Sequence, residues 1–200
     1  MTINSLLDQA SISPSASHSS GGIKVAGNRT IAQIYQAGRT GQLTSLKISV
    51  DYTGGATSLR AHIAIRDVVD GKPGSTVLGE ITAGTKDALW THTFTLPTSI
   101  AQDSGTAYAI VVDYPGGGGD DNFVWTGASG TNSSQPSFSG DGGAAAWSTK
   151  NYVLDFATWV TAVETSSDAS AVAGAPASSQ GIWDRTPTQG PGTSGGGTSG

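Results

Sequence analysis

The sequence has no cysteine and few basic residues, 10 lysines and arginines among 200 positions. Without cysteine, neither a disulfide framework nor a thiolate metal site can form. Binding to nucleic acid needs clustered cations that neutralise phosphates, and no such cluster occurs in this chain, whose formal net charge is −5. We therefore expect no nucleic acid partner.

Long apolar runs are also missing. No segment approaches the roughly 18 apolar residues that span a bilayer. Residues 1–8 have neither the positive charge nor the apolar stretch of a signal peptide. We expect no membrane partner, and a protein that assembles in the cytoplasm of its host without signal-peptide export.

Residues suited to catalysis are scarce. The chain has two glutamates, Glu80 and Glu164, and three histidines, His18, His62 and His92. None of the histidines belongs to a metalloprotease pair or lies near a serine nucleophile motif. A glycosidase pair would need aspartates, and no two of them are suitably placed by the sequence. The sequence predicts a protein that is not an enzyme.

Composition divides the chain into three zones. Residues 1–28 have few large apolar side chains beyond Leu6 and Leu7, and residues 162–200 are rich in Ala, Ser, Gly, Thr and Pro. Such segments bury too little apolar surface to offset their ordering entropy. We predict a domain over residues 29–161 between an N-terminal and a C-terminal arm, with one short helix near residues 4–9.

The middle zone alternates apolar and polar residues with the period of β-strands. Glycine-rich or proline-rich turns separate the apolar runs, for example at residues 70–74 and 115–119. The run at 107–112 is apolar on both faces, which is typical of a central strand. These features predict an all-β fold, a two-sheet antiparallel jelly-roll-like sandwich of eight or nine short strands with extended arms. The expected strands cover residues 31–36, 46–50, 59–66, 77–81, 90–96, 107–112, 122–126 and 152–157.

Several of these segments resemble a known family. Residues 32–38 contain an alanine–glutamine pair, then an aromatic residue and, three positions after it, a glycine. Residues 70–78 contain a Gly-x-Pro-Gly loop. Residues 139–147 resemble an S-x-DGG-x-x-W hairpin. Together they resemble the choice-of-anchor jelly-roll domains of bacterial surface and phage virion proteins. The resemblance covers roughly residues 29–160 and implies the fold more than a function.

Two small-ligand sites are conceivable from composition. Aromatic rings and amides near strand ends can hold a sugar, which stacks on a ring and hydrogen-bonds through its hydroxyls; the candidates are Tyr114, Trp125, Trp147 and Asn132. Tryptophans of a sandwich more often belong to its core. Acidic residues in glycine-rich loops can bind calcium; the candidates are Asp120, Asp121 and Asp141. Turn geometry and solubility explain these aspartates equally well, and no other cofactor is expected.

The arms carry isolated apolar residues. Ile182 and Trp183 lie within a polar tail, and Leu6 and Leu7 within a polar N-terminal zone. Tryptophan is favoured at the centres of protein interfaces, so we interpret these four residues as assembly contacts. The function predicted is a non-catalytic structural component of a phage-like virion, a capsid decoration or cement protein, a spike base or a tail accessory protein. Its partners would be other virion proteins and copies of itself. The alternative is a carbohydrate-binding module that recognises a host surface glycan.

Overall fold

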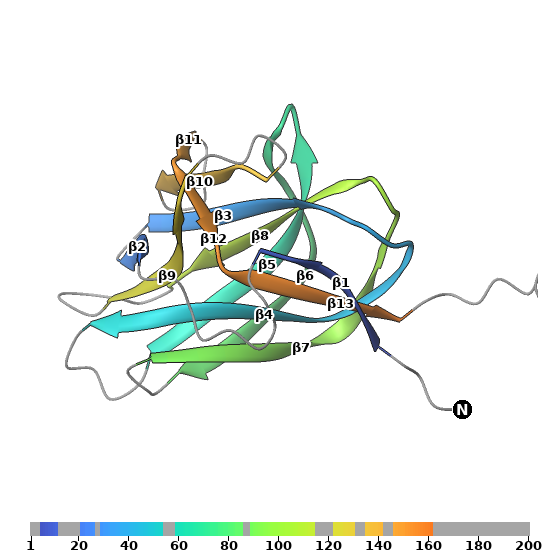
Figure 1. Ribbon diagram of the computed structural model, residues 1–200, viewed down its shortest axis with the longest axis horizontal. Coiled ribbons are helices and arrows are strands. Elements are labelled where there is room, and N and C mark those ends of the chain that lie inside the picture. Colours follow the sequence, from blue (N-terminus) through green and yellow to red (C-terminus); the bar gives the residue numbers. More distant parts are fainter. Residues whose placement is uncertain are drawn as a thin grey trace, which may run out of the picture. The chain divides into compact units, whose positions relative to one another are not determined.

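A computed structural model describes most of the first 161 residues of the chain, all in β-strands, turns and short connections. The described residues are 5–11, 21–26, 29–53, 59–85, 89–114, 122–130, 135–141 and 146–161. They form two antiparallel sheets, of seven and six strands, which pack face to face as a sandwich (Figure 1). This confirms the predicted fold class.

The seven-stranded sheet is built around a long strand, β4, which pairs with β7 along one side and with β13 and then β9 along the other. The sheet runs in the order β1-β13-β4-β9-β12, and β2 also pairs with β9. Its strands are β1 (Ser5–Ala10), β2 (Gly21–Ala26), β4 (Gly41–Thr53), β7 (Leu89–Gln102), β9 (Asn122–Ser129), β12 (Tyr152–Leu154) and β13 (Phe156–Thr161).

The six-stranded sheet runs in the order β11-β10-β3-β8-β5-β6. The strand that is apolar on both faces, β8, is central, as its sequence predicted. A long hairpin of β5 and β6 forms one edge of the sheet and turns at Asp70 and Gly71. The strands are β3 (Arg29–Gln36), β5 (Leu59–Val69), β6 (Lys72–Thr85), β8 (Ala107–Asp113), β10 (Ser137–Asp141) and β11 (Trp147–Lys150).

The main hydrophobic core lies between the sheets and contains the residues that alternation assigned to the inner face, such as Leu46, Ile48, Ile63 and Ile110. Its largest fully buried side chain is Trp125. Trp125 satisfies its one polar group by donating from Nε1 to the Asp155 carbonyl, at 2.9 Å. Burial of such apolar side chains contributes about 1.5–3 kcal/mol each and is the main source of stability.

The two sheets are also joined by a buried amide. Gln33, on β3, accepts a hydrogen bond at Oε1 from the backbone N–H of Leu154, on β12, at 2.9 Å. Its Nε2 donates to the Gln135 carbonyl at 2.7 Å and to the Ile34 carbonyl at 2.9 Å. The glutamine of the resemblance motif therefore connects one sheet to the other.

Near the N-terminus the structure differs from the sequence-based expectation. The helix predicted near residues 4–9 is wrong, because Ser5–Ala10 is strand β1 and pairs with β13. Residues 21–26, also expected to belong to an arm, form β2 and pair with β9 along their whole length. Much of the N-terminal zone is therefore part of the seven-stranded sheet.

Tyr35 provides a test of this packing at high pH. Burial, with smaller contributions from Asp8 and Tyr108, raises the pKa of Tyr35 well above that of an exposed tyrosine. The unfolded chain, with a tyrosine pKa of about 10, loses this proton first. Stability contributed by the protonated phenol is therefore present below about pH 10 and falls as the pH rises further.

The unfolding free energy, measured by urea denaturation, should fall as the pH rises from neutral to above about 10. We expect this fall to be smaller in the Tyr35→Phe variant than in the unaltered chain. The matched control is Tyr152→Phe, at a partly buried tyrosine at the margin of the core. An equally steep loss in the Tyr35→Phe variant would contradict this account.

Candidate functional site

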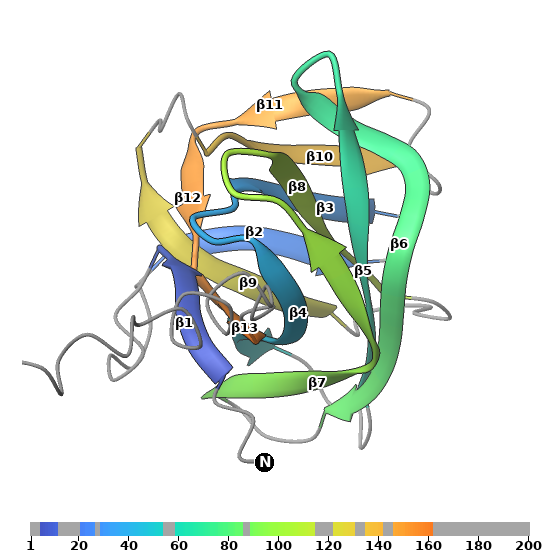
Figure 2. The ribbon, with the colours of Figure 1, turned by 90° about the vertical axis from the view of Figure 1, so that its right-hand side faces the viewer.

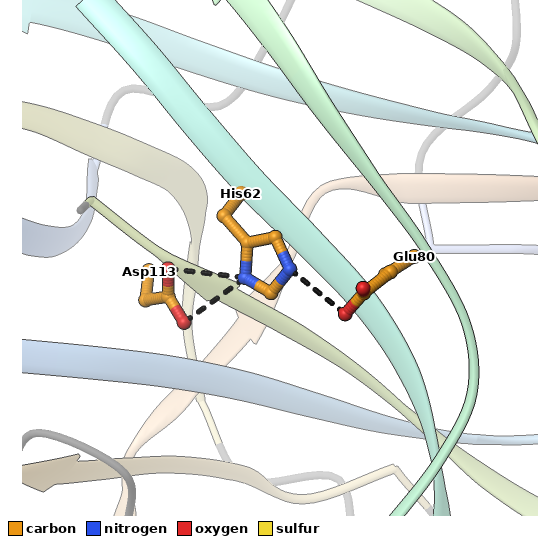
Figure 3. A network of polar contacts seen from close by, with 3 residues as sticks. All are labelled: His62, Glu80 and Asp113. Carbon is orange, nitrogen blue, oxygen red and sulfur yellow. Dashed lines mark hydrogen bonds and ion pairs between the residues drawn. The ribbon is translucent and has the colours of Figure 1, made fainter.

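The clearest cluster of titratable side chains lies on the outward face of the six-stranded sheet (Figure 3). Nδ1 of His62, on β5, lies 3.2 Å from both carboxylate oxygens of Asp113, on β8. Nε2 lies 3.1 Å from Oε2 of Glu80, on β6. The histidine ring therefore lies between two carboxylates that come from the strands on either side.

Strand register explains why these residues meet. His62 is directly opposite Asp113 in the β5–β8 pairing. Glu80 is opposite Ala64, two positions beyond His62 on the same face, so Glu80 and His62 are diagonal neighbours. Directly opposite and diagonal side chains on one face are close enough to interact.

The protonation state of His62 determines how many of these contacts are hydrogen bonds. Carboxylates only accept, a neutral imidazole has one N–H, and an imidazolium has two. Both contacts are therefore hydrogen bonds only in the imidazolium form. The side chains of His62, Asp113 and Glu80 are 22%, 29% and 59% exposed, respectively. Pairs this exposed contribute about 1 kcal/mol or less each.

The geometry of the cluster matches a structural contact better than a reacting site. A histidine that acts as general base needs a ring nitrogen facing the group that it deprotonates, and here each nitrogen faces a carboxylate. A single metal ion needs ligands that converge, whereas Asp113 and Glu80 lie at opposite nitrogens of the ring. Among the described residues, no three or more His, Asp or Glu side chains are placed to hold a metal ion.

The aromatic residues proposed for sugar binding lie in different environments. Trp125 and Tyr114 belong to the core, 0% and 8% exposed, so neither has a free ring face for stacking. Trp147 is partly exposed on β11. β11 is one edge of the six-stranded sheet, and the β5–β6 hairpin is the other. Asn132 lies outside the described residues.

Trp147 packs on a second hydrophobic cluster, which covers the outward face of the six-stranded sheet. Its ring lies against Phe138, with centroids 6.4 Å apart and planes at 75°. Val68, near the hairpin tip, contacts the same cluster from the other edge of the sheet. The buried members are Ala32, Ile34, Ala64, Ala109, Val111 and Phe138.

The predicted calcium ligands are not brought together by the described part of the chain. Asp120 and Asp121 lie outside it. For Asp141 only the backbone is described, at the end of β10 opposite Arg29. The calcium site stays a prediction.

Of the predicted assembly residues, Leu6 and Leu7 are 40% and 41% exposed on β1. Ile182 and Trp183 lie outside the described residues. β1 is the edge strand of its sheet, and it pairs with the strand that ends at residue 161.

A network around Asp8, which the sequence did not indicate, holds β1 in place. Oδ1 accepts from the backbone N–H of Gly38 at 3.0 Å, and Oδ2 accepts from Nε2 of Gln102 at 2.8 Å. Arg39 donates from Nε to the Leu7 carbonyl at 3.3 Å. Gly38 suits this close approach, because an added Cβ would lie 3.2 Å from the backbone oxygen of Asp8, which is tighter than ordinary contact. The exposed leucines are therefore presented by a firmly held strand.

A scan against models of known protein families found no match for this chain, and a search among curated proteins found no related sequence. No helix suited to crossing a bilayer occurs in the part of the chain that the structure describes. The fold is thus established as a two-sheet antiparallel sandwich, and the family resemblance stays a prediction.

The Asp8 network can be tested by Asp8→Ala, which leaves the Gly38 N–H and one N–H of the Gln102 amide without an acceptor, while Nε2 of Gln102 still donates to the Arg39 carbonyl at 3.1 Å. Loss of such acceptors costs about 1–3 kcal/mol. We expect faster hydrogen exchange of the β1 amides, with little change in the central strand β8. Ser5→Thr, on the same strand, keeps the hydroxyl that lies 3.3 Å from the Thr44 hydroxyl; it is the control and should leave exchange unchanged. Equal protection of β1 in both variants would show that Asp8 does not hold the strand.

Proposed function

We propose that the chain is a non-catalytic structural component of a phage-like virion, such as a capsid decoration, cement, spike-base or tail accessory protein. The observation that supports this best is the exposure of Leu6 and Leu7 on an edge strand that the Asp8 network keeps in position. Leu6 and Leu7 pair with Val160 and Trp159 and so lie on opposite faces of this edge. Each offers an apolar contact on a strand that has little conformational entropy left to lose on binding.

The proposal also draws on the sequence. Two of the segments that resemble choice-of-anchor domains, residues 32–38 and 70–78, lie in the described part of the sandwich, with Gln33 in the core and the hairpin turn at Asp70 and Gly71. Ile182 and Trp183 are the further contacts proposed, in the tail that follows β13 in the sequence. Many weak contacts of this kind add up through avidity on a repeating particle.

The proposal predicts that two variants, one lacking residues 163–200 and one carrying Leu6→Ser and Leu7→Ser, fold but are not incorporated into the particle. The described strands end at Thr161, so the truncation leaves both sheets intact. Incorporation is measured as the amount of chain that sediments with particles from producing cells, and folding by circular dichroism. The control is Thr95→Ser, at an exposed position on β7. Normal incorporation of both variants would reject attachment through the ends of the chain.

A second candidate function, recognition of a host surface glycan, is supported by one observation. Trp147 is the predicted sugar-binding aromatic that keeps an exposed surface, and its packing on Phe138 fixes the ring. A fixed, partly exposed ring is a suitable platform for stacking a sugar.

If this second function is correct, Trp147→Ala should weaken binding on a glycan array, while Trp147→Phe should weaken it less. Stacking on an aromatic ring contributes about 1 kcal/mol, so Trp147→Ala would weaken binding roughly fivefold or more. Binding unaffected by Trp147→Ala, or none by the unaltered chain, would reject it.

A further inference from the structure

Arg66, on β5, is a cation without a counter-charge on the outward face of the six-stranded sheet. It is opposite Ala109 of β8 and Val77 of β6, so apolar side chains flank it on both neighbouring strands. Its Nε is buried and has no hydrogen-bond partner in the described part of the chain. A buried donor without an acceptor is unfavourable, so this guanidinium would gain from a carboxylate that turned towards it.

The carboxylate next to Arg66 in the sequence is already in use. Asp67 accepts a hydrogen bond from the backbone N–H of Thr76, at 3.1 Å, across the β5–β6 hairpin. No described carboxylate forms an ion pair with Arg66. A partner for Arg66 must therefore come from elsewhere on the same face.

Glu80 is placed between Arg66 and His62. Glu80 is opposite Ala64 in the β5–β6 pairing, and His62 and Arg66 lie two positions to either side of Ala64, on the same face. Diagonal neighbours of this kind are within reach of long side chains. Figure 3 shows the Glu80 carboxylate turned towards the His62 ring. The Glu80 side chain is 59% exposed, so solvent leaves it room to turn the other way.

Glu80 cannot bind both partners at once. His62 and Arg66 are four positions apart on an extended strand, which separates them by about 13 Å. One carboxylate does not span that distance. The two contacts of Glu80 are therefore alternatives, and the charge of His62 decides between them.

The observed contacts of His62 are those of the imidazolium form, because both ring nitrogens face carboxylates, which only accept hydrogen bonds. When the ring loses a proton, one of the two contacts is lost. Asp113 is directly opposite His62, and both of its oxygens lie 3.2 Å from Nδ1. Glu80 is only a diagonal neighbour and is the more exposed of the two. The contact that is lost is therefore the one with Glu80.

The other groups around His62 do not offer Glu80 a second partner. From β8 the ring faces Asp113, which repels Glu80, and directly opposite on β6 is Thr82, which carries no charge. Arg60, on the same strand as His62, is opposite Gly84, four positions beyond Glu80 along β6. Within the described part of this face, Arg66 is the cation in diagonal reach of Glu80.

From this geometry we infer that Glu80 is a pH-dependent switch between two partners on β5. It binds the imidazolium of His62 in acid and the guanidinium of Arg66 when His62 is neutral. Histidine side chains usually change charge between pH 5 and 8, so acidification in that range frees Arg66 and alters the charge that the outward face presents. The switch goes beyond the proposed function and needs no particle.

The test follows Nε of Arg66 and the ring nitrogens of His62 by nuclear magnetic resonance of the full chain between pH 5 and 8. The Nε chemical shift of Arg66 should change with the same midpoint as the His62 ring. Contacts between the side-chain CH groups of Glu80 and Arg66 should appear towards pH 8. An exposed ion pair changes the ratio of two such orientations by about fivefold.

Two variants separate the movement of Glu80 from a direct effect of the His62 charge. Glu80→Gln keeps the size of the side chain but removes its charge, so the Arg66 response should be lost while His62 still titrates. His62→Gln is neutral at every pH, so Arg66 should already show at pH 5 the shift that the unaltered chain shows at pH 8.

Arg60→Gln is the matched control, because it removes a cation on the other side of His62 and should leave the Arg66 response intact. Amide spectra show whether each variant keeps the fold. The switch is refuted if the Nε shift of Arg66 stays constant while His62 titrates. It is equally refuted if the response persists in Glu80→Gln, or if His62→Gln leaves Arg66 as it is in the unaltered chain at pH 5.

Discussion

The relative position of the two sheets and the path of the last two strands depend on hydrogen bonds to polar groups that are buried inside the sandwich. Gln33 is fully buried, and both ends of its amide form hydrogen bonds. Its Nε2 donates to the carbonyls of Ile34, on the six-stranded sheet, and of Gln135, just before β10. Its Oε1 accepts from the N–H of Leu154, on the seven-stranded sheet. An unpaired buried amide costs about 1–3 kcal/mol. The two sheets are therefore held in one relative position, whereas apolar packing alone tolerates small shifts.

The same requirement explains why the last part of the sandwich is two strands rather than one. Residues 152–157 alternate as a single strand would, yet β12 and β13 are separated at Asp155. The backbone of Asp155 leaves the regular pairing: its N–H donates to the Thr126 carbonyl at 2.8 Å, and its carbonyl accepts from Trp125. Its carboxylate lies 2.7 Å from the Thr126 hydroxyl. The largest core side chain thus has its only donor satisfied, at the expense of one position in the ladder.

Alternation predicted the sandwich and the central position of β8, and turn residues predicted a turn within residues 70–74, because each depends on local pattern. The described residues form thirteen strands rather than the eight or nine expected. Alternation could not predict β1, which is short and only half apolar and which long-range contacts of Asp8 hold in place. Nor could it predict the His62 cluster, whose partners are 18 and 51 residues away and meet through register. Trp125 is in the core, as expected of most tryptophans in a sandwich, whereas for Tyr114, near a strand end, only the packing shows that it is a core residue.

The outward face of the six-stranded sheet carries apolar side chains that pack against one another, in the second hydrophobic cluster. A sheet that faces water on one side is normally polar there, but here small residues such as Ala64 and Ala109 are covered by Phe138 and Trp147 at one edge and Val68 at the other. Most of the apolar side chains on this face are therefore buried against one another. The polar network of His62, Asp113 and Glu80 occupies another part of it. Among the described residues, the large apolar side chains that stay exposed lie on β1 and on the β5–β6 hairpin, at edges of the two sheets.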